Sequence, residues 1–141
     1  MRTKLAVLVA GVGLLLVLAV LPVRAHHAFS AEFDASKPLK FTGTITKVEW
    51  VNPHVWIHIE VKKPEGTVES WAVEAGTPAV LFRRGFTKQL LAPGAEILVD
   101  GYRSKDGSQR MNGRDLRLPD GRSLFVGSSG TGAPSDPGSP K

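Results

Sequence analysis

Residues 39–61 read LKFTGTITKVEWVNPHVWIHIEV, and this stretch predicts two neighbouring β-strands. In its second half, apolar β-branched residues occupy every other position, namely Val55, Ile57, Ile59 and Val61. That period is typical of a strand with one buried face. The first half, Leu39 to Val51, also alternates, but its pattern slips by one residue near Thr46 and Lys47. Such a slip indicates a β-bulge or sharp bend, which lets one strand serve two sheet faces.

One helix and several further strands are predicted downstream. The expected strands are residues 67–74, 96–102, 112–118 and 123–126. Between the first two of these, Thr77 is a suitable N-cap, Pro78 suits the first helical position and Gly85 suits the position after the last turn. This pattern predicts a short helix over 79–84, followed by a second helical turn at 87–91.

The order of these elements decides the expected fold. Three meandering strands, a short helix and then further strands follow the order of an OB-fold, whose first strand bends strongly. We therefore expect a mainly β protein: a small five- to six-stranded OB-like barrel with one short helix between strands 3 and 4. A small β-sandwich is the competing architecture.

The first 25 residues have the three parts of a secretory signal peptide. Two basic residues precede an apolar run at 5–21, and small residues stand at the positions that signal peptidase requires before its cut. We expect cleavage between Ala25 and His26 and a periplasmic or secreted product. The alternative is an uncleaved membrane anchor, for which the apolar run is short.

The mature chain divides into three parts. We expect an N-terminal arm at 26–38, the OB-like domain at 39–126 and a tail at 127–141. The tail is rich in Gly, Ser and Pro and has no hydrophobic residue larger than alanine, so it is expected to be disordered.

Charge and cysteine content limit the expected partners. The precursor has a net charge of +5, but three of its 18 basic residues and none of its 13 acidic residues lie in the leader. The mature chain is therefore nearly neutral, and we expect no nucleic-acid partner. There is no cysteine to carry a lipid or a disulfide, so we expect a fold that relies on its core and no stable membrane insertion after cleavage.

Several segments together resemble a known family. They are HHAFSAEFD at 26–34, GTITKVEWVNPH at 43–54, Trp71, FRRGFTKQLLAPG at 82–94 and DGYRSKDGS at 100–108. This combination resembles the bacterial family called domain of unknown function 6152. The resemblance covers nearly the whole mature chain and implies an exported single-domain protein. It implies no activity, since the family is uncharacterised.

The predicted mature N-terminus is a candidate copper site. A free α-amine and the imidazole of His26 can chelate one metal ion, with His27 beside them, in a pattern that resembles a copper-binding histidine brace. Amine and imidazole nitrogens favour Cu(II). A brace needs a third nitrogen, and His54 is the preferred donor. His58 lies four residues further along the same strand, about 13 Å away, so one ion can take only one of the two.

The competing hypothesis is that these histidines have no metal-binding role. His26 and His27 then form an unstructured terminus, and His54 is a turn residue bonded to nearby backbone. Glu32 and Asp34 can supply an oxygen ligand, but acids in a polar arm are more often simply solvated.

A second candidate surface is the outward face of the second strand. His54, Trp56, His58 and Glu60 project from it while the β-branched residues point inward. A half-exposed Trp56 suits stacking on a ligand or docking of a protein, and Arg103 and Lys105 in the basic loop extend this surface. Alternatively, the arm or the last strand folds over Trp56 and buries it.

No catalytic residues are predicted. The chain has no nucleophile elbow, no Gly-rich phosphate loop, no HExxH and no CxxC, so an enzyme is not expected. Two hypotheses follow: an exported, non-catalytic binding protein that uses copper or another ligand, and a periplasmic protein-interaction module without metal.

Overall fold

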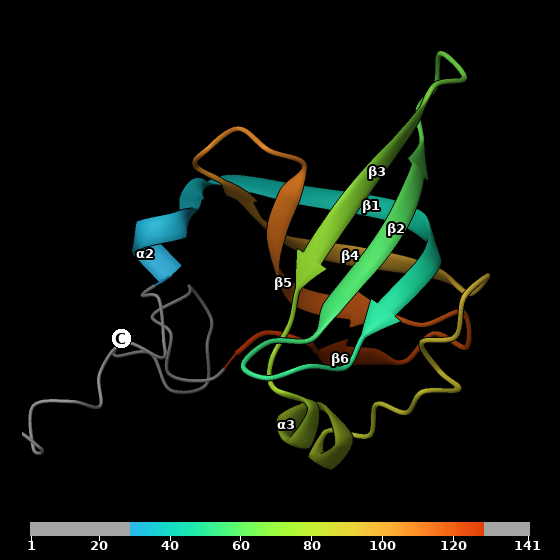
Figure 1. The fold of residues 1–141 in the computed structure, drawn as a ribbon. Helices are drawn as coiled ribbons and strands as arrows, with labels where there is room; N and C mark the ends of the chain where they lie inside the picture. The colour runs from blue at the N-terminus through green and yellow to red at the C-terminus, as the bar shows by residue number, and fades with distance from the viewer. Residues whose placement is uncertain (1–28, 129–141) are drawn as a thin grey trace, which may run out of the picture.

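The computed structural model describes residues 29–128 as one β-rich domain (Figure 1). The predicted signal peptide, His26, His27 and most of the predicted tail lie outside the described residues. The elements in chain order are α2 (Phe29–Glu32), β1 (Phe33–Glu49), β2 (Trp56–Lys62), β3 (Val68–Glu74), α3 (Pro78–Arg83), β4 (Glu96–Ser104), β5 (Arg110–Arg117) and β6 (Ser123–Phe125).

The strands close into a ring. Their order in the sheet is β3-β2-β1-β4-β5-β6, and β3 also pairs with β5 in parallel, so that five strands form a closed, barrel-like circuit with β6 added beside β5. The prediction of a mainly β, OB-like fold with one short helix between strands 3 and 4 is confirmed. Figure 1 shows α3 beside one end of this ring, with the β2–β3 turn projecting at the opposite end.

The long first strand joins both halves of the ring, as its sequence predicts. Residues 38–44 pair with β4, and residues 44–49 pair with β2. The register shifts between Ile45 and Lys47, where the alternation of apolar residues slips. The β-bulge expected from this slip is therefore present, and it lets β1 turn from one partner to the other.

β1 begins earlier than its alternation pattern indicates. Its first residue, Phe33, lies within the segment predicted as an arm, six positions before Leu39. The extension follows from two tertiary contacts: Phe33 pairs with Ser104 of β4, and its ring lies in a small buried cluster with Phe29 and Tyr102. Residues 29–32 form one helical turn instead of extended arm.

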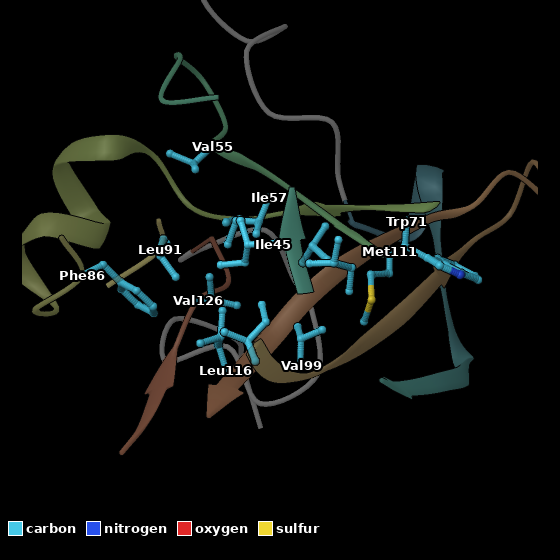
Figure 2. Packing of buried hydrophobic residues seen from close by; sticks show 14 of the residues in the cluster. Ile45, Val55, Ile57, Trp71, Phe86, Leu91, Val99, Met111, Leu116 and Val126 are labelled. Carbon is cyan, nitrogen blue, oxygen red and sulfur yellow. The ribbon is translucent and has the colours of Figure 1, made fainter. Parts of the chain in front are cut away.

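The main core fills the ring and continues under α3. Ile45, Ile57, Val99 and Leu116 come from four different strands and are all at most 1% exposed. Figure 2 shows Phe86 and Leu91 closing one end of this core, while Trp71 and Met111 lie toward the other. Burial of these apolar side chains supplies the main driving force for folding in a chain without disulfides.

The helix α3 is capped as predicted. Thr77 is the N-cap, and its hydroxyl oxygen accepts a hydrogen bond from the amide of Val80 at 3.3 Å. Pro78 begins the helix, and Gly85 adopts a φ of 91° just after its end. The second helical turn is a hydrogen-bonded turn, in which Leu91 donates to the carbonyl of Thr87. Within residues 29–128, neither helix is long and apolar enough to cross a membrane.

Candidate functional site

His54 lies in the loop between β1 and β2, which is clamped to the end of β3. Val55 donates a backbone hydrogen bond to Gly76, and Ala75 donates one back to Val55. The imidazole contacts the same residues at the end of β3: its Nδ1 lies 3.1 Å from the carbonyl oxygen of Ala75. A carbonyl oxygen can only accept, so Nδ1 carries the hydrogen and the neutral ring keeps its lone pair on Nε2.

Glu74, the last residue of β3, is the buried carboxyl beside this ring. Its Oε1 lies 3.8 Å from Nδ1 of His54, and its side chain is 10% exposed. In the parallel pairing of β3 with β5, Glu74 is opposite Asn112, whose Nδ2 donates to Oε1 at 3.5 Å. Burial raises the pKa of Glu74, and this effect outweighs the opposing influence of His54. A buried carboxyl with a raised pKa beside a histidine is a common feature of functional sites.

The chain after β6 covers the same ring nitrogen. The hydroxyl oxygen of Ser128 lies 3.2 Å from Nδ1 of His54 and donates to the carbonyl of Ala75 at 3.4 Å. Arg84, just after α3, holds this segment by donating to the carbonyls of Phe125 and Gly127. His54 is therefore fixed between the end of β3 and the segment after β6.

The N-terminal helical turn α2 borders this polar cluster. Arg110 of β5 lies 3.9 Å from Glu32 and 2.9 Å from Asp106. Both Glu32 and Arg110 act on the carboxyl of Glu74: Glu32 raises its pKa and Arg110 lowers it. The start of the described chain is thus electrostatically linked to the His54–Glu74 pair.

α2 is anchored firmly to the barrel. Phe29 is 4% exposed, and its ring meets Tyr102 edge-on with centroids 5.3 Å apart. The carbonyl of Glu32 accepts from the amide of Lys105, and the carbonyl of Ser30 accepts from Nζ of Lys105. Three positions after His26, the chain is therefore fixed in place.

Comparison with known proteins places the chain in a family. The model of the family of unknown function DUF6152 matches residues 14–113. The chain belongs to this family. The resemblance seen in the sequence is confirmed, and the matched segment contains His54, Glu74 and Asn112, whereas Ser128 lies beyond it. No curated protein and no solved structure matches the chain.

In this DUF6152 protein, His58 has different neighbours from His54. Its Nε2 lies 3.5 Å from Oε1 of Glu49, and within residues 29–128 that nitrogen is buried without a hydrogen-bond partner. His54, in the loop before β2, and His58, on β2, therefore face different carboxylates, Glu74 and Glu49. Trp56 between them is half-buried and Glu60 is exposed.

The two basic residues assigned to a partner surface are engaged within the DUF6152 fold. The guanidinium of Arg103 lies 5.6 Å from the centre of the Trp71 ring, and Lys105 holds α2 through Ser30. In the described part of the chain, no hydrogen bond or ion pair joins either residue to Trp56 or Glu60. The described part of the arm packs on Tyr102.

Glu74, Asn112 and Ser128 are the site residues that sequence reasoning missed. Glu74 is the last residue of a predicted strand. It stands two residues after Ala72 and so belongs to the residues of that strand that are expected to face outward, which is its only local signal in the sequence. Asn112 joins it only through the parallel β3–β5 pairing, which connects residues far apart in the chain. Ser128 falls in the segment predicted as a tail.

The chemistry of this site is that of a single oriented nitrogen ligand with a carboxylate behind it. Glu74 faces the Nδ1 side of the ring, so Nε2 is the nitrogen available to a metal ion, and the carboxylate is an outer partner. No group of three or more His, Asp and Glu side chains within residues 29–128 is placed to hold a metal ion. A complete site at His54 needs further ligands from outside these residues.

Proposed function

We propose that this DUF6152 protein is exported and binds a copper ion between His54 and the histidines that begin the mature chain. The observation that carries the proposal is the fixed orientation of His54. Its Nδ1 donates to Ala75 and faces Glu74, which is how metal-binding histidines are commonly held while Nε2 serves as the ligand.

The anchored α2 supports the second half of the proposal. Phe29 is buried against Tyr102, and Glu32 acts on the pKa of Glu74. His26 precedes Phe29 by three residues, and three residues of extended chain span about 10 Å. The amine and imidazole of His26 thus have a short tether to Phe29, and α2 borders the polar cluster that contains Glu74.

The donor set decides which metal is proposed. Two imidazole nitrogens and an amine nitrogen form a set that favours Cu(II), the tightest binder in the divalent series. The free amine exists only after the leader is removed between Ala25 and His26, so the site is proposed to form only after export. This role requires binding and no catalytic step.

In the test, matched forms of the mature protein are titrated with Cu(II). Calorimetry and electron paramagnetic resonance monitor the binding. The reference begins at His26, and a second form carries one additional alanine before it. His54→Asn removes Nε2 while its amide can still donate to Ala75. His58→Asn is the control, because it removes the other histidine of residues 29–128, which faces Glu49 and not Glu74.

The proposal predicts one tightly bound copper ion in the reference and in His58→Asn. It predicts an affinity at least about 100-fold lower, a loss of about 2.7 kcal/mol, in His54→Asn and in the form with the extra alanine. Thermal unfolding shows whether each variant is folded. Equal binding by the reference and by either altered form contradicts the proposal, and so does mass spectrometry of the exported protein that shows a first residue other than His26.

A further inference from the structure

A pocket separate from the His54 region lies where β1, β4 and β5 meet. Its volume is about 330 Å³, and its walls include Pro38, Leu39 and Lys40 from β1, Asp100 and Tyr102 from β4, and Arg114 from β5. This volume is within the range of cavities that bind small molecules. The pocket therefore has the size for a compact metabolite of a few heavy atoms.

A β-bulge places Arg114 in this pocket. Asp100 pairs with Asp115, but the next residue, Gly101, pairs with Gly113, so Arg114 is an extra residue on β5. Bulges often redirect a side chain and are common beside binding sites. Here the bulged residue is the one whose guanidinium lines the pocket.

The charges in the pocket are only partly satisfied within the described residues. Nε of Arg114 donates its one hydrogen to Asp115 at 2.9 Å. Oδ1 of Asp100 lies 3.0 Å from the same nitrogen, yet within residues 29–128 it has no hydrogen-bond partner. Oδ1 of Asp100 thus forms an ion pair with Arg114 but accepts no aligned hydrogen bond within residues 29–128.

The pocket presents both signs of charge beside an apolar wall. Lys40 is exposed at the rim on β1, Arg114 is about one-third exposed, and the Asp100 side chain is 23% exposed. A simple anion meets the repulsion of Asp100, and a simple amine meets that of Lys40 and Arg114. A molecule with both charges can satisfy all three groups.

We propose that this pocket binds a free α-amino acid with an aliphatic side chain. Its carboxylate pairs with Lys40 and Arg114, and its ammonium group donates to Asp100. Its side chain lies against Pro38 and Tyr102, which are paired across β1 and β4. Charge-assisted hydrogen bonds of both signs fix such a ligand in one orientation.

The test uses three probes that share one aliphatic side chain and differ in their charged groups. They are leucine, 4-methylpentanoate, which lacks the amine, and 3-methylbutylamine, which lacks the carboxylate. Each is titrated into the isotope-labelled mature protein while backbone amide resonances are followed by nuclear magnetic resonance. Concentrations extend to about 10 mM, ten times a Kd that corresponds to about 4 kcal/mol of binding. Leucine is expected to shift the amides of Leu39, Gly101 and Arg114, and both analogues to bind at least about tenfold more weakly, a loss of 1.4 kcal/mol.

Variants test which residues carry the affinity. Lys40→Gln removes an exposed charge with little risk to folding, and Arg114→Gln removes the bulged cation. Arg122→Gln is the control, because Arg122 pairs with Asp120 in the turn before β6. Leucine binding is expected to weaken at least about tenfold in the first two variants and to stay unchanged in the third. Absence of leucine-dependent shifts at the pocket, equal binding of all three probes, or unchanged binding by Lys40→Gln overturns the proposal.

Discussion

Nδ1 of His54 lies 3.8 Å from Oε1 of Glu74, although the two residues are 20 positions apart, one in the loop before β2 and the other at the end of β3. Both side chains are largely buried, and the pair lies between the end of β3 and the segment after β6. The carboxylate faces the ring nitrogen that carries the hydrogen, so it orients the imidazole without blocking Nε2. This relationship gives the proposed copper site its first testable consequence.

Glu74→Gln should weaken copper binding without changing its stoichiometry. The amide keeps the size of the carboxyl but removes the negative charge behind the His54 ring. Loss of such an outer partner commonly lowers metal affinity by about 10–100-fold. Glu49→Gln is the matched control, since Glu49 stands beside His58 at 3.5 Å. Competition titrations with a chelator measure both affinities, and an equal effect of the two substitutions contradicts the role assigned to Glu74.

The strands could be predicted from sequence because their signals are local. The alternation of Val55, Ile57 and Ile59 needs no knowledge of distant residues, and the slip near Thr46 marks the register shift of β1. The early start of β1 could not be predicted, because residues 34–38 read DASKP and show no alternation. Phe33 enters the sheet through its contacts with Tyr102 and Ser104, which lie some 70 residues away.

Of the candidate site, only His54 could be predicted from local sequence signals. His54 could be proposed from its turn position and its chemistry. Glu74 and Asn112 could not be joined to it, because parallel pairing of β3 with β5 follows from closure of the whole ring. Long-range pairings of this kind leave no periodic trace in either strand, so the carboxylate of the site became visible only in the folded chain.

Gly101→Ala should destabilise the fold far more than Gly66→Ala. A Cβ at position 101 would lie 2.0 Å from the carbonyl oxygen of Asn112, so the bulge between β4 and β5 must deform, at a cost of about 3 kcal/mol or more. Gly66 has a φ of 89° but open space around it, and alanine there costs only the left-handed strain of about 1 kcal/mol. Chemical denaturation measures both values. Similar losses for the two substitutions contradict the close approach at Gly101.

Asp106→Asn should make stability less dependent on pH in acid. Hydrogen bonds from the hydroxyls of Ser104 and Ser108 hold the pKa of Asp106 well below its ordinary value of 3.8. The ionised carboxylate therefore stabilises the fold above that pH, and this contribution is lost as the pH falls below about 3.8. The amide can still accept hydrogen bonds but has no charge to lose.

The measurement for Asp106 is the free energy of unfolding as a function of pH. In the wild type it should fall more steeply below the ordinary pKa of the carboxyl than in Asp106→Asn. Glu60→Gln serves as the control, because the described residues provide no hydrogen bond or ion pair to the exposed side chain of Glu60. Parallel curves for the wild type and Asp106→Asn show that this loop contributes nothing to acid sensitivity.

Phe29→Ala should weaken copper binding although Phe29 is not a proposed ligand. Its ring packs on Phe33 and Tyr102 in a cluster separate from the main core, and it fixes the chain three residues after His26. Without this anchor the terminal nitrogens lose their positioning, and the metal must restrict a freer segment when it binds. We expect the affinity for copper to fall by up to about tenfold, together with a loss of stability of up to about 3 kcal/mol.

The control for Phe29→Ala is Phe82→Ala, which removes a ring that is 47% exposed and stacks on Trp50. Both variants are compared with the wild type by Cu(II) titration at a temperature where thermal unfolding shows each to be folded. The anchor accounts for copper affinity only if Phe29→Ala alone weakens it. Because Phe33 and Tyr102 remain in place in this variant, unchanged affinity means that the position of α2 on the barrel does not organise the terminal histidine, and the tether between His26 and His54 then lacks its structural support.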